Sequence, residues 1–446
     1  MLPLLLILIF CILGVLTGVV TGLLPGLHVN NIILILLSIS GTIIPSLSFL
    51  FEYGISSEFI LILICIYIIS TSICHSFINI IPSTFLGAPD EDKALSVLPA
   101  HSLLLEGKGY EAVSLSALGS YGAILLCFIL IYPIRFIIGE PLFFYDSLRE
   151  IMLFVLIAIS ILMIATEKSK IKEFGKKDII PYIGGISFAA VVFFISGIFG
   201  ILIFNISVYS PIGLNSSVLF PALAGLFGTP TLLTSFMTNP KIPNQNIEEP
   251  VLNKKAKKAS ILSVATGSIS GIIVAIIPGI TSATGTILSL IARGESDKRQ
   301  TIITLSAVNT ACAFFVVITM FIILKARSGA ALAVMDLISI SEWKIIFLPE
   351  NLAFFLIAIL FGGTLSFFLT IKMGKLFANK FKNIPYLLII KLTIFMISAL
   401  VFIFTGFIGL CVLFFATFIG LLPVLWGVRR SHCMGILIIP IILFFI

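Results

Sequence analysis

The chain has 446 residues, of which 59% are hydrophobic and 11% are charged, with 27 Lys or Arg against 20 Asp or Glu. A soluble domain carries about a quarter of its residues as charges, so these proportions exclude a water-soluble globule and indicate a polytopic membrane protein in a lipid bilayer. The basic residues lie in loops rather than on one exposed face, which argues against a nucleic-acid partner.

Apolar runs after residue 58 predict nine membrane-spanning helices, each near the roughly 20 residues that a crossing needs. The predicted spans are 59–81, 112–134, 148–166, 180–204, 213–236, 301–324, 351–371, 384–405 and 406–426. Residues 434–446 are apolar but short for a crossing. The first 20 residues are also apolar, and because no Lys or Arg precedes them and no Ala-x-Ala-like site follows, we interpret them as membrane structure and not as a cleaved signal peptide.

Basic residues gather in a subset of the loops, and this bias orients the spans. The basic segments are 83–111, 168–177, 241–258, 293–299 and 372–382, together with Arg429 and Arg430. These segments hold most of the Lys and Arg of the chain. The positive-inside rule therefore places them in the cytoplasm and the N-terminus outside, in a multi-pass protein of the cell (plasma) membrane.

Two apolar stretches are predicted to enter the membrane and return to the same side. Residues 259–292 lie between two Lys-rich cytoplasmic segments and are broken at Ile277-Pro278-Gly279. Residues 1–45 have the same form, with a break at Leu24-Pro25-Gly26, and this hairpin enters from outside. A proline opens the helix ladder, and such backbone at membrane depth needs protein or a water-filled cavity around it.

A shift of 253 residues superposes the two broken stretches. It matches Gly14, Gly18, Pro25 and Gly26 with Gly267, Gly271, Pro278 and Gly279. The elements that follow each hairpin also repeat in order, on opposite sides. The predicted fold is therefore an all-α polytopic membrane protein with two inverted-topology repeats, each beginning with a Pro-Gly broken re-entrant helical hairpin, and about 9–10 spans plus two hairpins.

This organisation divides the chain into four parts. They are the first repeat 1–166 with hairpin 1–45, a two-span insert 167–258 with Lys-rich cytoplasmic loops, the second repeat 259–405 with hairpin 259–292, and C-terminal transmembrane segments in 406–446. Inverted repeats with broken segments at matching positions are typical of secondary transporters, whose site lies between the repeats. Helix N-termini after each break suit a carboxylate or phosphate. Packing kinks without a ligand are the alternative.

Four segments resemble the TctA family, the large permease subunit of tripartite tricarboxylate transporters. They are GVLTGVVTGLLPGLHVNN (14–31), IIPSTFLGAPDEDKALSVLPAHSLLLEGKGYEAV (80–113), GSISGIIVAIIPGITSAT (267–284) and GLLPVLWGVRRSH (420–432). The resemblance implies ion-gradient-driven uptake of carboxylate-type solutes, with an extracytoplasmic solute-binding protein and a small membrane subunit as partners. The chain departs from the family pattern where His28, Asn30 and Asn31 stand in place of small residues.

Candidate substrate-binding residues surround the two breaks. They are Pro25, Gly26, His28, Asn30 and Asn31 at the first break, and Pro278, Gly279, Thr281, Ser282 and Thr284 at the second. Near the first break, these side chains either contact the ligand or hydrogen-bond the freed backbone groups. At the second, the hydroxyls either bind an ion or anion or cap a helix.

Further candidates lie in the polar stretch that follows the predicted span 59–81, and inside the predicted span 301–324. Ser83 and Thr84 follow Pro82 in an opened segment and are expected to line the pathway. Asn309 is expected to line the site or to join helices by hydrogen bonds. Candidates for ion coupling are Asp90, Asp92 and Thr310, while Asp90, Glu91 and Asp92 also suit the first turn of a surface helix. Lys391 is expected to snorkel to the inner surface.

We therefore predict a permease that moves a small anionic, carboxylate-type solute by alternating access, coupled to Na⁺ or H⁺, with no other cofactor and no bound metal. A lipid-phosphate flippase using the same hairpins is the alternative. An intramembrane enzyme using His28, His75 or His101 is a third class. The chain lacks Gly-x-Ser-x-Gly, His-Glu-x-x-His and Cys/His metal spacings, so we do not expect an enzyme.

The hairpin tips generate a first test. Gly26→Leu or Gly279→Leu should abolish transport while leaving membrane insertion intact, because a branched side chain fills the space at an opened backbone. Uptake in membrane vesicles, compared with the amount of inserted protein, measures the effect. Full activity in both variants would remove the hairpin tips from the site.

Overall fold

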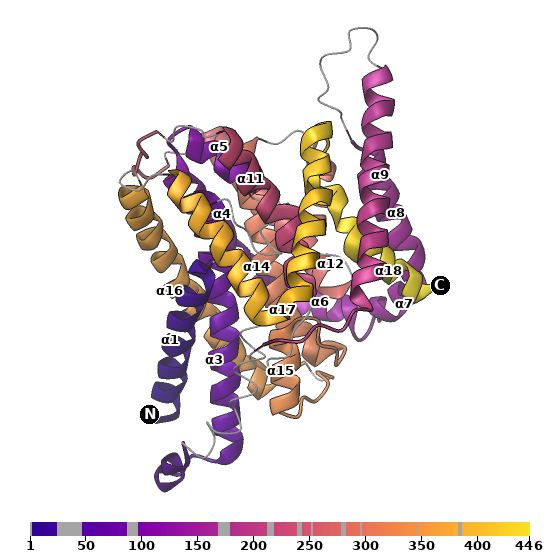
Figure 1. Ribbon diagram of the computed structural model, residues 1–446. Coiled ribbons are helices and arrows are strands. Elements are labelled where there is room, and N and C mark those ends of the chain that lie inside the picture. Colours follow the sequence, from indigo (N-terminus) through magenta and orange to yellow (C-terminus); the bar gives the residue numbers. More distant parts are fainter. Residues whose placement is uncertain are drawn as a thin grey trace.

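The computed structural model describes residues 2–24, 47–86, 97–167, 179–211, 218–238, 243–250, 253–277, 282–294, 297–344, 346–381 and 386–446. Every regular element in these ranges is a helix (Figure 1). Nine of the described helical stretches are long and apolar enough to cross a membrane. A further pair, α7 and α8, is bent by 73° and passes the same test as one unit. The predicted all-α polytopic fold class is confirmed.

The helices fall into three groups along the chain. The first holds α1 (Leu2–Leu23), η1 (Ser48–Tyr53), α3 (Ser57–Ile78), α4 (Ile80–Phe85), α5 (Val97–Leu105), α6 (Gly109–Ile138), α7 (Phe144–Glu150) and α8 (Met152–Ala165). The middle group holds α9 (Ile179–Phe204), α10 (Leu219–Leu223), η3 (Ala224–Gly228) and α11 (Thr229–Thr238). The last holds α12 (Lys254–Ile276), α13 (Ser282–Arg293), α14 (Lys298–Ile322), α15 (Gly329–Leu337), α16 (Glu350–Phe381), α17 (Tyr386–Trp426), η4 (Arg430–Met434) and α18 (Gly435–Phe445).

Side-chain caps fix the first residue of three long helices. The side chain of Ser56 accepts a hydrogen bond from the backbone N–H of Phe59 at the start of α3. Asn253 and Asp297 do the same at the starts of α12 and α14. Each cap satisfies one of the N–H groups that a helix leaves free at its first turn.

Two helix pairs pack through glycines in the same register. A Cβ added to Gly14 would lie 2.5 Å from the carbonyl oxygen of Tyr67, so α1 and α3 are in backbone contact there. One turn later, Gly18 lies against Thr71 and Cys74. The pair α12–α14 repeats this register with Gly267 against Thr304 and Ala307, and Gly271 against Val308 and Ala311. In both pairs the glycine number and the partner number rise together, so the paired helices run in the same direction.

Contacts along α6 and α16 give the relative direction of these pairs. Helix α6 runs parallel to α14, because Glu111 meets Arg299 near their starts and Gly139 meets Ile322 near their ends. Helix α16 runs antiparallel to α6 and parallel to α3. The contacts that show this are Gly363 with Ile124, Gly374 with Val113, Phe354 with Phe59, and Phe377 with Phe85. The pair α1–α3 therefore runs opposite to the pair α12–α14.

The two groups also exchange their later helices. Helix α6 packs on α12 and α14, whereas α16 packs on α1 and α3. The short helices follow the same rule, since α5 packs on α14 and α15 packs on α3. Helices α6 and α16 contact each other between the two pairs. Each glycine-packed pair is thus covered by a helix from the other half of the chain.

Helix α17 is two antiparallel segments that meet at Gly406, whose φ of 64° is favourable only for glycine. Before Gly406, Phe404 packs on Phe220 and Ile390 lies in one cluster with Leu232. Past it, Gly225 lies against Leu413 and Ala416, and Thr229 bonds to Thr417. The first segment is therefore antiparallel to α10–α11 and the second is parallel to it, as expected for the separate spans 384–405 and 406–426.

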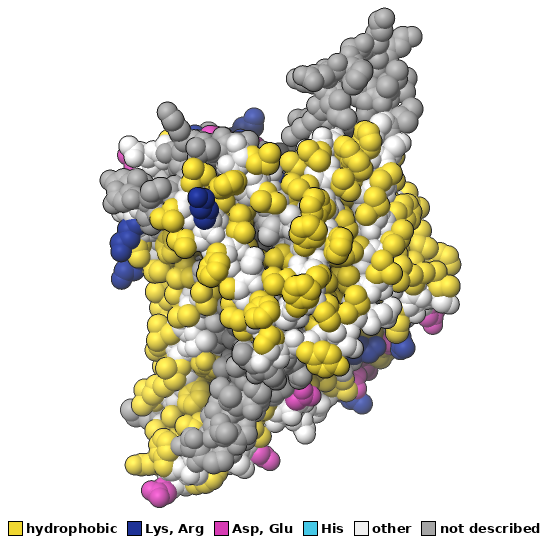
Figure 2. All heavy atoms as spheres, viewed as in Figure 1, with side chains coloured by type: hydrophobic (Ala, Val, Ile, Leu, Met, Phe, Trp, Pro, Cys, Tyr) yellow, Lys and Arg dark blue, Asp and Glu magenta, His cyan; other side chains and the backbone are white. Residues whose placement is uncertain are grey.

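Figure 2 shows hydrophobic side chains over most of the visible face, with charged side chains toward its two ends. Within the apolar region, Lys391 is exposed and its Nζ lies 6.0 Å from the ring centre of Phe236. All seven cysteines are free thiols and none is exposed. Soluble proteins rarely expose an apolar area of this extent to water, so this surface is that of a protein surrounded by lipid.

The shared glycine register leads to a stability prediction. Gly271→Ala should lower the thermal midpoint of unfolding, because its Cβ would lie 2.5 Å from the Val308 carbonyl oxygen and the helices must separate, at a cost of about 1–3 kcal/mol. Gly184→Ala in α9 is the matched control, since its Cβ meets no atom within 4 Å. Thermal melts of the purified protein in detergent measure both, and equal midpoints would contradict the close packing.

Candidate functional site

The second broken stretch forms a helical hairpin in the described residues. Helix α13 turns back along α12, because Gly285 lies against Val274 and Arg293 donates a hydrogen bond of 2.8 Å to the hydroxyl of Ser263. Arg293 also donates to Thr304 of α14 at 2.9 Å. Helix α13 therefore lies against both α12 and α14, and its first residue stands next to the break at 278–281, which lies outside the described residues.

The hairpin turns before α14 ends. Helices α12 and α14 are parallel, and Gly271 lies level with Val308. Six residues later α12 has ended, at the level of about residue 314, whereas α14 continues to Ile322. At 1.5 Å per residue the turn is about 12 Å short of the end of α14. The N-terminus of α13 is consequently inside the helical bundle.

Asn309 of α14 meets the start of α13. The Ser282 hydroxyl lies 3.4 Å from Asn309 Oδ1 and donates to it. The side-chain nitrogen of Asn309 is enclosed and has no hydrogen-bond partner in the described part of the chain, and the same holds for the hydroxyl of Thr310. An enclosed polar group without a partner costs about 1–3 kcal/mol. The arrangement leaves a hydrogen-bond donor available beside a helix N-terminus.

Serines of α6 extend this polar region. The hydroxyls of Ser116 and Ser306 are 2.7 Å apart, and Ser120 donates to the Ser306 carbonyl at 3.4 Å. Ser306 is three residues before Asn309 and four before Thr310, so the three lie on neighbouring positions of one helical face. A continuous line of uncharged polar groups thus connects α6, α14 and α13.

The electric field around Asn309 and the start of α13 comes from dipoles. No described Asp, Glu, Lys or Arg forms an ion pair or hydrogen bond with Ser282, Asn309 or Thr310. The first N–H groups of the 12-residue helix α13 carry the positive end of its dipole. An amide N–H₂ and a helix N-terminus together present hydrogen-bond donors, which suits a carboxylate or phosphate.

Ser83 and Thr84 lie in a second polar region, at α4. The Ser83 hydroxyl donates to the Asn79 carbonyl at 2.8 Å, which occupies it within its own helix. Thr84 is fully buried, and its hydroxyl has no hydrogen-bond partner within the described ranges. Helix α4 packs on α5, α6 and α16. Across the part of the chain that the structure describes, no hydrogen bond joins this region to Asn309.

His101 of α5 bonds to the backbone of Thr84. Burial lowers the pKa of His101 below its ordinary value, and the hydrogen bond to Thr84 raises it by less. The imidazole is therefore neutral at pH 7. No local pattern connects His101 to Thr84, 17 residues away, so the sequence alone did not indicate a role for His101 in a permease.

Several predicted site residues lie outside the described residues. These are Pro25, Gly26, His28, Asn30, Asn31, Asp90, Glu91, Asp92, Pro278, Gly279 and Thr281. Of the others, the structure brings Ser282 and Asn309 together in one place with Thr310 next in the chain, buries Thr284 in the same helix, and puts Ser83 and Thr84 in another. The untested residues remain predictions.

Two further polar residues of the region around Asn309 were not predicted from the sequence and are identified only by helix packing. Ser116 and Ser306 carry no motif and are recognised by the contact of their hydroxyls. The shared glycine register also makes Ser72 of α3 the counterpart of Asn309, since Thr71 and Cys74 correspond to Val308 and Ala311.

Within the described ranges, no group of three or more His, Cys, Asp or Glu side chains is placed to hold a metal ion.

Comparison with known proteins gives a consistent match along the whole chain. Residues 8–435 match the family described as "Tripartite tricarboxylate transporter TctA family". The chain is also 30% identical over 448 aligned residues to an uncharacterized protein of Methanocaldococcus jannaschii, and this match covers 98% of the chain and 99% of that protein. No solved structure matches the chain.

The lowered pKa of His101 predicts a pH dependence of stability. The folded protein binds this proton less readily than the unfolded chain, so the neutral form stabilises the fold above pH 6.5, and that contribution is lost as the pH falls from 6.5 through the lower folded pKa. His101→Gln should therefore show a smaller fall in melting temperature between pH 7.5 and 5.0 than the wild type. An equal fall in both proteins would contradict a buried, neutral His101.

Proposed function

Because the chain belongs to the tripartite tricarboxylate transporter TctA family, we propose that it is the permease of such a system and carries a small carboxylate-bearing anion. The family is one of membrane transporters, and the helices of this chain are those of a multi-pass membrane protein. The resemblance found in the sequence segments is confirmed by the family match. The identity of the solute and the path that it takes belong to the proposal.

The observation that carries the proposal is the unpaired amide nitrogen of Asn309 beside the start of α13. A carboxylate oxygen at this point accepts from the amide and from N–H groups at the N-terminus of α13. No described side chain competes as a negative charge there. Asn309 is 3% exposed, in a helix that is almost wholly buried, which favours a small solute over a lipid headgroup that must keep its acyl chains in the bilayer.

Helix directions support alternating access between two inverted repeats. The pairs α1–α3 and α12–α14 use the same glycine register and run in opposite directions. An enclosed site between two such units opens to either side when one unit moves against the other. By the same symmetry we propose that Ser72 faces the first hairpin, as Asn309 faces the second.

Coupling and partners complete the proposal. We propose that Na⁺ or H⁺ drives uptake, with Thr310, Asp90 and Asp92 as candidate groups. A small membrane subunit and an extracytoplasmic solute-binding protein are the expected partners of the family. The Lys-rich segments then face the cytoplasm, and the N-terminus and helix α15 face outside.

Asn309→Leu tests the site. The variant keeps the number and branching of the side-chain heavy atoms but has no amide donor, so uptake of the transported carboxylate should fall at least tenfold, the loss expected for one hydrogen bond to a charged group. The measurement is uptake of radiolabelled mono-, di- and tricarboxylates into proteoliposomes under a Na⁺ or H⁺ gradient.

Asn205→Leu at the end of α9 is the matched control, because its side chain bonds only to the carbonyl of Ile201 on an exposed surface. Uptake should remain at the wild-type level in this control. Wild-type uptake by Asn309→Leu would exclude the amide as a ligand, and accumulation without any ion gradient would exclude coupled transport.

A further inference from the structure

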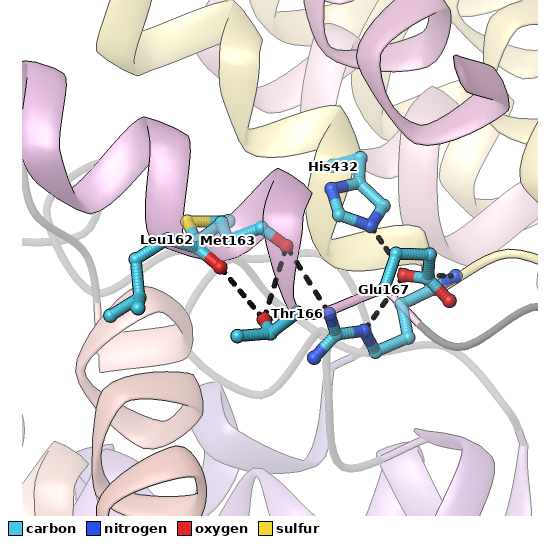
Figure 3. A network of polar contacts seen from close by, with 6 residues as sticks. Leu162, Met163, Thr166, Glu167 and His432 are labelled. Carbon is cyan, nitrogen blue, oxygen red and sulfur yellow. Dashed lines mark hydrogen bonds and ion pairs between the residues drawn. The ribbon is translucent and has the colours of Figure 1, made fainter. Parts of the chain in front are cut away.

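The segment Arg429–His432 is part of a stretch that resembles the family, yet the function proposed above makes no use of it. Arg429 Nε donates to Glu167 Oε2 at 2.8 Å, and His432 Nε2 lies 2.6 Å from the same oxygen. Figure 3 shows the His432 ring pointing toward Glu167. Arg429 Nη2 also donates to Met163 and Thr166, so the segment is fixed to the end of α8.

The Oε2 atom of Glu167 is the common partner of Arg429 and His432. Burial raises the pKa of the Glu167 carboxyl, but the hydrogen bonds and charge interactions with His432 and Arg429 together lower it by more, and the net pKa is below the ordinary value. Glu167 is therefore a carboxylate, and its single negative charge is balanced by Arg429. The adjacent residue, Arg430, needs a different counter-charge.

Arg430 is only 8% exposed, and no described carboxylate forms an ion pair with it. Its Nη1 donates to the Phe227 carbonyl at 3.3 Å and to the Thr231 hydroxyl. Its Nε and Nη2 have no hydrogen-bond partner in the described ranges, yet they are not among the fully enclosed atoms. These two nitrogens are therefore not fully enclosed and remain available as donors.

Arg135 shows what a purely structural buried arginine looks like in this chain. It is 3% exposed and also lacks a described carboxylate partner. Its Nη2 donates to the carbonyls of Trp343 and Lys344, and Nη1 to that of Glu140. The rings of Phe136 and Trp343 lie 5.2 Å from its guanidinium carbon. In the described part of the chain, Arg430 has neither additional carbonyl partners nor an aromatic ring against its guanidinium.

The unused edge of Arg430 has a defined chemistry. Nε–H and Nη2–H are parallel donors, and this edge of a guanidinium matches two oxygens of a carboxylate or phosphate. The neighbouring η3 is a π-helical turn, a distortion often found at functional sites. We propose that Arg430 binds an oxyanion, a carboxylate or a phosphate, through its Nε–Nη2 edge.

The place of Arg430 gives this site a role separate from Asn309. Helix η4 packs on α13, the returning limb of the hairpin. An oxyanion at Arg430 therefore lies beside α13, whose first residue Ser282 bonds to Asn309, but it is bound by a residue from the C-terminal part of the chain. The ligand is either a free anionic solute or the phosphate of a lipid headgroup.

The experiment uses the full-length protein in nanodiscs, with thermal unfolding as the measure of binding. Sodium citrate and inorganic phosphate are the probes in phosphatidylcholine nanodiscs, with sodium chloride at matched ionic strength as the reference. Added phosphatidylglycerol provides the lipid arm. A ligand that binds the folded state raises the melting temperature with its concentration.

The expected result is a rise in melting temperature in the wild type that is lost in Arg430→Gln. Arg430→Lys keeps the charge but loses the two-donor edge, so its apparent Kd should be at least tenfold weaker. Arg149→Gln, with the same charge change on the exposed helix α7, is the matched control and should respond as the wild type does. If Arg430→Gln does not fold, the lysine variant decides.

Each outcome has one meaning. A response to citrate or phosphate in neutral lipid identifies a free anion, and a response to phosphatidylglycerol alone identifies a lipid phosphate; both support the site. No response in the wild type, or a wild-type response in both Arg430 variants, overturns it. The readout is binding, so a failure of carboxylate uptake would end the transport proposal and leave this one standing.

Discussion

The constraint on which the rest of this structure depends is that a bilayer offers no hydrogen bonds to the backbone. Helices satisfy it inside each segment, but an interrupted helix does not. Helix α13, which follows the break, lies against both α12 and α14, and α6 from the other half of the chain packs on α12 and α14. Glycines at 267 and 271 let α12 and α14 touch along their backbones, which closes the space that lipid would otherwise enter.

Helix packing near the break brings polar side chains together. Packing of α13 on α14 brings Ser282 to Asn309, and packing of α6 on α14 brings Ser116 to Ser306. These groups are neutral, so they carry no desolvation cost of the size that a buried charge brings. For the proposed carrier a neutral site of donors is suitable, because a permanent strong charge would hold an anionic solute too tightly to release it.

The charged residues in the described part of the chain fall into three classes: paired with an opposite charge, surrounded by carbonyls and aromatic rings, or left with donors that have no partner. Arg429 and Glu167 neutralise each other, and Arg135 is wrapped by carbonyls and aromatic rings. Arg299 and Glu111 pair near the starts of two parallel helices and tie α6 to α14. Arg430 is the exception among these, since two of its three guanidinium nitrogens have no hydrogen-bond partner among the described residues. Arg430 therefore differs from these other arginines, because a buried charge without a counter-charge is costly unless a ligand supplies that counter-charge.

The sequence by itself determined the class of fold, most of the spans, the reversal near Gly406 and the family, because hydropathy, basic loops and Pro-Gly breaks are local signals that a single segment carries. It also indicated Ser282 and Asn309 as polar residues in apolar surroundings, without placing them together. Only the tertiary structure decided that Ser282 bonds to Asn309, that Ser116 meets Ser306, that Ser83 and Thr84 lie elsewhere, and that Arg429 is paired while Arg430 is not. Those contacts join residues far apart in the chain, and their geometry depends on which helices pack together, which no local pattern encodes.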